Sequence, residues 1–150
     1  MWFSTYMFIH IYKMEIQDIQ QEIIEEFEFL DDWIQKYEHL IELGKNLPII
    51  AEANKTEDNL ISGCQSKVWI FAEQKDDKLI YSADSDAILT KGVVALLLRV
   101  FSNQTPQAIL DANTDFIDQI GLKEHLSPTR ANGLLSMVKQ IKLYALAFQK

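Results

Sequence analysis

The sequence predicts an α+β fold, in which a small antiparallel β-sheet of two or three strands packs against helices. Helical patterns occupy both ends of the chain, and short runs rich in β-branched and aromatic residues lie only in the middle. Segments in this order do not form the alternating βαβ units of a parallel sheet. With 150 residues, of which 48% are hydrophobic, the chain can bury a sizeable core in a single domain.

Two amphipathic helices are predicted before the strands. Apolar residues recur at spacings of three and four over residues 16–30, which is the period of one helical stripe. A second helix is expected to begin near Asp32 and to stop at Gly44. Residues 46–59 keep no period and contain Pro48, so we expect an irregular connection there.

The middle of the chain carries the strand signals. Residues 68–72 have the β-branched and aromatic content of a strand, and residues 79–81 are predicted to return antiparallel to them after a turn at Asp76 and Asp77. Residues 60–61 are a short extended candidate for a third strand. Because a sheet of this size is not stable alone, helices are expected to cover one face.

A buried helix is predicted directly after the strands. Residues 88–101 are apolar nearly all round, which is typical of a helix inside the core. Asp84, Ser85 and Asp86 offer side chains that could cap its start. Gly92 would let another element approach this helix closely.

Three further helical segments are expected towards the C-terminus. Cap-plus-proline pairs at residues 105–106 and 127–128 predict the starts of a short helix and of a long amphipathic C-terminal helix. Between them, residues 116–120 are predicted to form a helical turn that ends at Gly121.

Residues 1–13 are predicted to be an N-terminal extension outside the fold, and residues 14–150 a single domain. The amphipathic pattern begins directly after Met14, so we interpret Met14 as the natural start; the alternative is that the extension docks onto the domain. The extension lacks the basic leader, unbroken apolar stretch and small-residue cleavage site of a secretory signal. No apolar run approaches the roughly 20 residues of a membrane span. We therefore expect a cytoplasmic protein without a membrane-spanning segment.

The charge pattern argues against nucleic acid as a partner. The chain has 14 Lys and Arg against 22 Asp and Glu, a net charge of −8, whereas binding to phosphates needs clustered cations. Residues 15–32 hold eight acidic and no basic residues, and residues 121–150 hold five basic residues and one acidic residue. This asymmetry is typical of solvated helix faces and would also steer docking to a partner protein.

Cys64 is the first candidate for a functional residue. As the sole cysteine it can form no intramolecular disulfide, and a free cysteine is often only a small buried hydrophobe. It lies in the polar segment Ser62-Gly63-Cys64-Gln65-Ser66 between two extended segments, which predicts a loop or hairpin tip. Because Gly63 allows backbone angles that other residues avoid, we expect that the thiol can swing out and react as its thiolate.

The chemistry open to a single cysteine is limited. An iron–sulfur scaffold needs several thiolate ligands, and a zinc site built from Cys64, His39 and His125 has no short ligand spacing. A Cys–His hydrolase or acyl-transferase, with His125 or His39 as the base, is one open hypothesis, and a non-catalytic adaptor in which Cys64 only packs is another. Thiol–disulfide redox normally uses a second cysteine. Transfer of sulfane sulfur between proteins needs only one thiol, and it fits the sequence.

Arg130 is the second candidate. It falls in the first turn of the last predicted helix, where a cation opposes the helix dipole at a cost of about 0.3–1 kcal/mol. A charge so placed indicates an anionic partner, which could be the carboxylate of Asp84 or of Asp86. The alternatives are a thiolate, a persulfide or an acidic patch on a partner protein.

These motifs together resemble the SufE family of sulfur-acceptor proteins. The resemblance rests on Gly63-Cys64-Gln65-Ser66-Lys67-Val68-Trp69, on Asp84-Ser85-Asp86-Ala87, and on His125-Leu126-Ser127-Pro128-Thr129-Arg130-Ala131-Asn132-Gly133-Leu134. Shorter matches lie at residues 41–44, 47–48, 91–92 and 105–106, in an order that stays consistent from Ile16 to the C-terminus. Ala83 departs from the glycine that is usual in the family before Asp-Ser-Asp.

The resemblance implies a fold like that of the IscU-like iron–sulfur scaffold proteins, without their metal ligands and with no cofactor of its own. It implies that the protein takes persulfide sulfur from a SufS-type cysteine desulfurase, which carries pyridoxal phosphate. It also implies that the protein stimulates this desulfurase and passes sulfur to an iron–sulfur scaffold complex for cluster assembly. The protein would then be a sulfur-transfer protein and desulfurase activator rather than a stand-alone enzyme.

The resemblance also assigns roles to residues. Cys64 aligns with the family's sulfur-accepting cysteine, and Arg130 aligns with its characteristic arginine near that cysteine. The residues expected to support the site or to bind the partner are Gly63, Gln65, Ser66, Asp84 and Asp86. Because a persulfide is reactive, we expect Cys64 to be partly sheltered in the free protein, with Arg130 nearby.

Overall fold

The structure, a computed structural model, describes residues 15–149. The helices are α2 (Ile16–Glu28), α3 (Trp33–Lys45), α4 (Ile88–Phe101), α5 (Pro106–Asp111), α6 (Asp115–Gln119) and α7 (Pro128–Phe148), and the strands are β1 (Val68–Lys75) and β2 (Lys78–Ser85). Short 3-10 turns lie at Glu52–Asn54, Glu57–Asn59 and Lys123–His125. This order confirms the predicted α+β class. The N-terminal extension at residues 1–13 lies outside the described residues, so its role stays a prediction.

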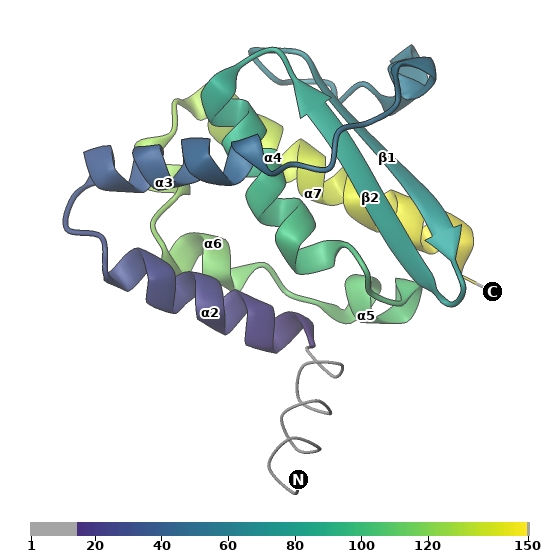
Figure 1. Cartoon of the computed structure of the whole chain (residues 1–150), viewed down its shortest axis with the longest axis horizontal. Coiled ribbons are helices and arrows are strands. Elements are labelled where there is room, and N and C mark those ends of the chain that lie inside the picture. Colours follow the sequence, from purple (N-terminus) through teal and green to yellow (C-terminus); the bar gives the residue numbers. More distant parts are fainter. Residues whose placement is uncertain (1–14, 150) are drawn as a thin grey trace, which may run out of the picture.

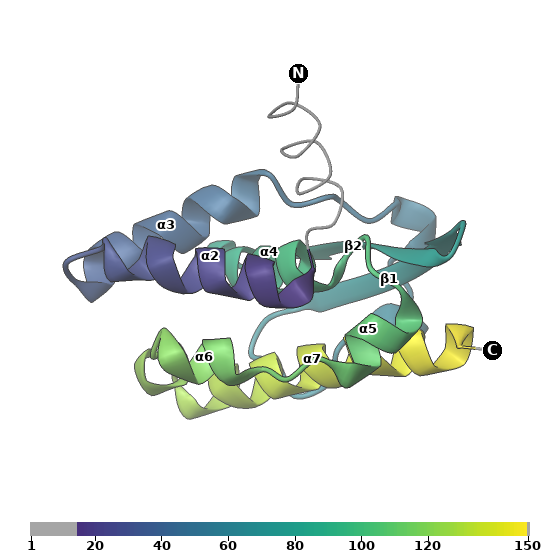
Figure 2. The same ribbon diagram turned by 90° about the horizontal axis from the view of Figure 1, so that it is seen from below.

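The helices form two layers beside a β-hairpin (Figure 1). Figure 2 shows α2 and α3 on one side and α5, α6 and α7 on the other. Helix α4 packs against both α3 and α7 and so joins the layers. The hairpin contacts α4 through β2 and α7 through β1, and the helices thereby give the small sheet the cover it needs.

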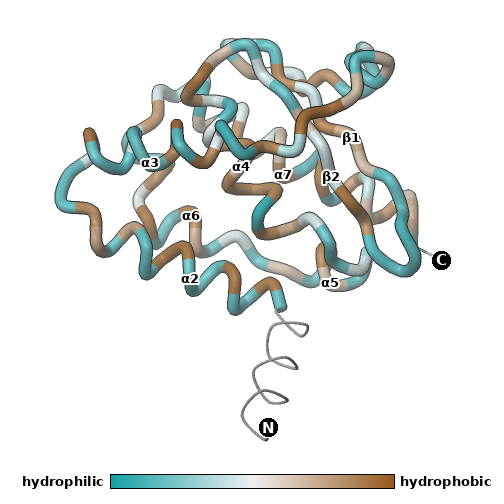
Figure 3. The backbone as a smooth tube through the Cα atoms, in the orientation of Figure 1, coloured by the Kyte–Doolittle hydropathy of each residue, from teal (hydrophilic) through white to brown (hydrophobic). Residues whose placement is uncertain are grey.

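The N-terminal helices bury one stripe each, as their sequence pattern predicts. In α2, Ile16, Ile23 and Phe27 are buried, and Figure 3 shows brown and teal alternating along this helix. The start of α3 is capped by Asp32, whose carboxylate accepts a hydrogen bond of 2.9 Å from the backbone N–H of Gln35.

Helix α4 is buried on most sides and crosses α3 at very short range. A Cβ atom on Gly92 would lie 2.2 Å from the backbone oxygen of Leu40, and one on Gly44 would lie 3.0 Å from the backbone nitrogen of Gly92. Gly92 has no room for a side chain, and at Gly44 a Cβ atom would fit only if its neighbours shifted by a few tenths of an ångström. The expectation that Gly92 admits a close neighbour is therefore confirmed, and α3 is that neighbour.

The hairpin is regular, but the third strand is not formed. Strands β1 and β2 pair antiparallel along their whole length, with Val68 opposite Ser85. Leu60 makes only an isolated bridge to Trp69. A 3-10 turn ends at Asn59 and the chain turns away after residue 61, so too few extended residues remain for a ladder.

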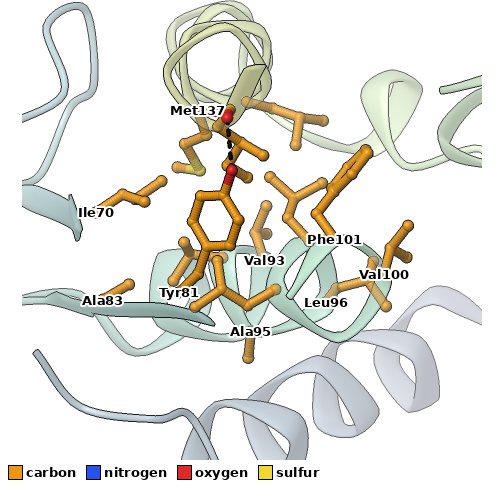
Figure 4. Packing of buried hydrophobic residues seen from close by; sticks show 14 of the residues in the cluster. Ile70, Tyr81, Ala83, Val93, Ala95, Leu96, Val100, Phe101 and Met137 are labelled. Carbon is orange, nitrogen blue, oxygen red and sulfur yellow. Dashed lines mark hydrogen bonds between the residues drawn. The ribbon is translucent and has the colours of Figure 1, made fainter. Parts of the chain in front are cut away.

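Tyr81 of β2 joins the hairpin to α7 inside the core. Figure 4 shows its ring between Ile70, Val93 and Phe101, with the hydroxyl directed at α7. The hydroxyl donates a hydrogen bond of 2.7 Å to the backbone oxygen of Ile141, and burial raises the pKa of Tyr81, which keeps the donor protonated. This contact fixes α7 relative to the sheet.

The predicted caps divide into two groups. Thr105 and Ser127 each accept a hydrogen bond of 3.2 Å from a backbone N–H in the first turn of α5 and α7, which confirms both cap-plus-proline predictions. The capping of α4 by Asp84, Ser85 and Asp86 was wrong, because Ala87 is its N-cap and no side chain caps it. Asp84 and Ser85 belong to β2 instead.

Within residues 15–149, no helix combines the length and the apolar character needed to cross a bilayer.

Candidate functional site

Cys64 lies at the tip of the loop that leads into β1, which we call the cysteine loop (residues 61–67). At its base, the backbone N–H of Ile61 donates a hydrogen bond of 2.8 Å to the oxygen of Val68. Gly63 has a φ of +83°, a conformation that suits glycine and allows the chain to turn directly before Cys64. The structure thus places Cys64 at the loop tip that the sequence predicts.

A small number of hydrogen bonds connect the cysteine loop to the start of α4. The Asp86 carboxylate accepts a bond of 3.0 Å from the backbone N–H of Lys67, and the backbone N–H of Asp86 donates one of 3.2 Å to the oxygen of Lys67. The Ser66 hydroxyl donates to the Thr90 hydroxyl at 3.2 Å. Bonds of this kind contribute about 0.5–1.5 kcal/mol each, so the loop can open at moderate cost.

The half-buried Cys64 side chain lines a small pocket between the cysteine loop, α4 and α7. The pocket has a volume of about 10 Å³, which is the space for about one water molecule. The lining is mainly apolar and consists of Cys64, Gln65, Ser66, Leu89, Thr90, Val93, Leu126, Arg130, Gly133 and Met137. Four predicted site residues, namely Cys64, Gln65, Ser66 and Arg130, therefore meet at one place.

Burial controls the chemistry of the resting thiol. It raises the pKa of Cys64 above its ordinary value, because a charged thiolate is poorly solvated in an apolar pocket. The thiol is therefore protonated at neutral pH, which lowers its reactivity as a nucleophile. Cys64 is partly sheltered and Arg130 lines the same pocket, as the sequence led us to expect.

Arg130 is an exposed residue that also lines this pocket. Its backbone N–H binds the capping Ser127, whose hydroxyl also lies 3.5 Å from the Gln65 side-chain oxygen. Among the residues that the structure describes, no carboxylate lies within ion-pairing distance of the guanidinium. The expected pairing of Arg130 with Asp84 or Asp86 was therefore wrong, since both carboxylates have other partners.

Asp84 is placed outside the pocket and ties the sheet to its surroundings. Its carboxylate lies 2.8 Å from Lys55 Nζ and 3.4 Å from Lys91 Nζ. Partial burial opposes ionisation of Asp84, but the hydrogen bonds from Lys55 and from the Ser85 backbone outweigh it. Together with the charges of both lysines they lower the pKa of Asp84. Asp84 therefore supports the fold, and only Asp86 of the predicted pair holds the cysteine loop.

Neither His39 nor His125 reaches the pocket. His39 Nε2 lies 3.0 Å from Glu26 Oε1, and the His125 ring stacks on Trp33 with 3.9 Å between ring centroids. Within residues 15–149, no three His, Cys, Asp or Glu side chains are arranged to hold a metal ion. The Cys–His hydrolase and zinc-site hypotheses are not favoured by this arrangement.

The wall that α7 contributes to the pocket was missed in the sequence. A Cβ atom on Gly133 would lie only 2.9 Å from Cys64 Sγ, and Met137 lies one helical turn further on. A glycine inside a predicted helix is a signal that something lies close to it. The identity of its neighbour depends on packing between segments far apart in the chain, which a single sequence does not give.

Comparison with known proteins defines the class of this protein. The family model described as "SufE: Fe-S metabolism associated domain" matches residues 21–145. The chain belongs to the SufE family, which gives it a role in iron–sulfur metabolism.

Several relatives are similar along most of the chain. An uncharacterised SufE-like protein of Rhizobium meliloti is 43% identical over 127 residues, which are 81% of this chain and 90% of that protein. An uncharacterised SufE-like protein of Synechocystis is 41% identical over 127 residues, with 85% of this chain and 80% of that protein covered. SufE-like protein 1, chloroplastic/mitochondrial, of Arabidopsis thaliana is 41% identical over 84% of this chain, but over only 34% of its own length.

A solved structure shows the same fold. The solution structure of a hypothetical protein from Thermus thermophilus superposes with a TM-score of 0.72, covering 86% of this chain and 94% of the other at 20% identity.

Proposed function

We propose that this protein is a sulfur acceptor and carrier that takes persulfide sulfur from a SufS-type cysteine desulfurase onto Cys64. The main support is the position of the chain's one cysteine: it is half-buried at a loop tip held by few hydrogen bonds, in a protein of the SufE family. A thiol that is shielded at rest and can be exposed by a short loop suits the handling of a reactive persulfide.

The proposed reaction needs one cysteine and no oxidant. The Cys64 thiol gives its proton to water, and the thiolate attacks the outer sulfur of the donor persulfide. The donor's S–S bond breaks while an S–S bond to Cys64 forms, and the electron pair leaves with the donor cysteine as its thiolate. Sulfur atoms and electrons balance, because the outer sulfur only changes its attachment.

In this proposal, the pocket keeps Cys64 as a thiol at rest, and opening of the loop favours the thiolate that reacts. At rest, burial keeps the thiol protonated, as the raised pKa of Cys64 indicates. We propose that docking of the desulfurase opens the cysteine loop, which removes the desolvation that disfavours the thiolate. The exposed guanidinium of Arg130, which has no carboxylate partner within the described residues, would then stabilise the thiolate and the persulfide anion.

The partners follow from this chemistry. The desulfurase, with its own pyridoxal phosphate, releases sulfur from free cysteine, and this chain is proposed to need no cofactor. Removing the sulfur frees the desulfurase cysteine for another turnover, which would appear as stimulation. The carrier would then deliver its sulfur to an iron–sulfur scaffold complex.

Mass spectrometry tests the proposal directly. The protein is incubated with a purified SufS-type desulfurase and free cysteine, and its intact mass is measured under non-reducing conditions. We expect the wild type to gain the mass of one sulfur atom, and Cys64→Ser to gain none. No gain in the wild type, or an equal gain in Cys64→Ser, would refute the proposal. Full desulfurase stimulation by Cys64→Ser would instead identify a non-catalytic adaptor.

A further inference from the structure

The Cys64 sulfur rests against the backbone of α7 at a position where the helix has no side chain. A Cβ atom built on Gly133 would lie 2.9 Å from Cys64 Sγ, closer than the optimal separation of about 3.5–4.0 Å between non-bonded atoms. The same Cβ atom would lie 3.4 Å from Cys64 Cα and 3.5 Å from Cys64 Cβ, which are tolerable contacts. The sulfur is thus the one Cys64 atom that an added methyl group would displace.

Nothing in the local backbone requires a glycine at this position. Gly133 lies inside α7 with an ordinary helical conformation, whereas Gly63 and Gly121 have φ angles of +83° and +73°. Glycine is a poor helix former, so its presence inside a helix indicates a packing or functional reason. The close approach of the sulfur is that reason.

If the two surfaces are forced apart, the cysteine loop is the one that yields. From Gly133 onward, helix α7 is held by buried residues, including Leu134 and Met137, and by the hydrogen bond of Tyr81 to Ile141. Around Cys64, the loop is connected through the exposed Asp86–Lys67 pair, the Ser66–Thr90 contact and the long Ser127–Gln65 hydrogen bond of 3.5 Å. A side chain at position 133 would therefore move the sulfur outward, not the helix.

We propose that Gly133 is a positioning residue that gives the Cys64 sulfur its resting place and so sets the equilibrium between a seated and an outward thiol. The seated state is possible because α7 offers bare backbone there. The relevance of this equilibrium to sulfur transfer rests on the proposed function, but the equilibrium itself belongs to the free protein. It can therefore be measured without a desulfurase.

The first experiment measures the reactivity of the thiol in the folded, unloaded protein. Alkylation of Cys64 by iodoacetamide is followed at neutral pH for the wild type, Gly133→Ala and the control Asn132→Ala, each relative to its own rate in denaturant. Asn132 is the exposed neighbour on the same helix, so its variant changes helix propensity without touching the thiol. We expect at least a fivefold faster rate for Gly133→Ala and an unchanged rate for Asn132→Ala. An unchanged rate in a folded Gly133→Ala would overturn the proposal.

The second experiment tests whether the Cys64 sulfur atom is what makes Gly133→Ala unfavourable for stability. Unfolding by urea is measured for the double-mutant cycle of Gly133→Ala and Cys64→Ala. With the sulfur removed, Gly133→Ala is expected to stabilise the protein, because alanine is the better helix former. With the sulfur present, this gain is expected to be lost or reversed. Additive effects would overturn the proposal. Should Gly133→Ala fail to fold, renewed folding in the Cys64→Ala background would support it, and no recovery would overturn it.

The outcomes separate this inference from the proposed function. Faster alkylation and a coupled cycle, together with a wild type that gains no sulfur from the desulfurase, would keep the role of Gly133 and remove the sulfur-acceptor function. Normal sulfur loading together with additive effects in the double-mutant cycle would keep the sulfur-acceptor function and remove the proposed role of Gly133.

Discussion

Burial of Cys64 decides how reactive its sulfur atom is in the free protein. The sulfur is half-buried beside apolar side chains, and burial raises the pKa of the Cys64 thiol. Among the described residues, no charged neighbour lowers the pKa of Cys64. Arg130 lines the pocket but is exposed to solvent. The resting protein therefore holds a poor nucleophile, and reactivity must come from a change of surroundings.

This shift predicts the pH dependence of alkylation. The rate of Cys64 alkylation by iodoacetamide in the native protein should rise with pH around a midpoint higher than that of the same protein in urea. The folded-state pKa is the higher one, so the contribution of Cys64 to stability is present below the unfolded pKa and is lost as pH rises through the folded pKa. A native midpoint equal to or below the denatured one would contradict a sheltered thiol.

Asp86 is predicted to control how readily the cysteine loop opens. Asp86→Ala removes the carboxylate that accepts the Lys67 backbone N–H, a bond worth about 0.5–1.5 kcal/mol. We expect Cys64 to be alkylated about three- to tenfold faster, because the loop opens more often. Asp77→Ala, at the exposed turn of the hairpin, is the matched control and should leave the rate unchanged. Equal rates for the two variants would show that the Asp86 bond does not restrain the loop.

At the scale of elements, the site lies between the cysteine loop, α4 and α7, and β2 supports it from outside the pocket through its contact with α4. Asp84 near the end of β2 binds Lys55 and Lys91, and this ties the irregular connection before β1 to the sheet and to α4. Partial burial alone would raise the pKa of Asp84, but these contacts lower it. A lowered pKa adds stability above the unfolded value of 3.8 for this group, and that stability is lost as pH falls through the folded pKa.

Asp84→Asn should therefore destabilise the protein by about 1–2 kcal/mol near neutral pH, measured by urea unfolding. The difference from the wild type should shrink as the pH falls below about 4 and through the lower folded-state pKa of Asp84, where the wild-type carboxylate becomes neutral as well. Asp77→Asn provides the control with an exposed carboxylate. A difference that stayed constant down to acidic pH would mean that the charge of Asp84 is not what stabilises the fold.

The crossing of α3 and α4 gives a second prediction at this scale. Gly92→Ala would place a methyl group 2.2 Å from the Leu40 backbone oxygen, where helix backbone and not a flexible side chain must move. We expect a loss of about 3 kcal/mol or more in the free energy of unfolding, since overpacking of a rigid contact is costly. Ile88→Ala, an exposed change at the start of the same helix, should cost far less. Similar losses for both variants would argue against the tight crossing.

These elements also show what a single sequence can predict. Helix starts at Ser127 and Thr105, the loop position of Cys64 and the close approach at Gly92 all follow from local chemistry, and the structure has them. The capping prediction for Asp84 fails because this carboxylate pairs with Lys55. Lys55 lies in an irregular segment, and the sequence has no pattern there that would indicate the pairing. Likewise the contact of Gly133 with Cys64 joins two segments far apart in the sequence, and only the packed structure brings them together.

Across the whole molecule, charge is distributed unevenly around the net value of −8. The exposed Arg130 lies beside the pocket, whereas acidic residues crowd the first helices, where Glu26 binds both Arg99 and His39. A cation beside a reactive thiol can attract an acidic surface and speed its docking, an effect that weakens as salt rises.

Arg130→Ala is therefore predicted to weaken stimulation of the desulfurase several-fold while leaving thermal stability within about 1 kcal/mol, because no described partner holds the guanidinium. The loss should be largest at low ionic strength. Lys139→Ala, an exposed cation further along α7, is the control and should have little effect. Unchanged stimulation by Arg130→Ala would remove this residue from the site.

The most direct test of the account is a single-turnover transfer. A desulfurase preloaded with persulfide and freed of cysteine is mixed with this protein, and the intact masses of both proteins are followed with time. The account predicts that the desulfurase loses one sulfur atom while Cys64 gains one, and that Cys64→Ser leaves the desulfurase loaded. A desulfurase that keeps its sulfur when mixed with the wild type, or one that loses it with no gain at Cys64, would contradict it.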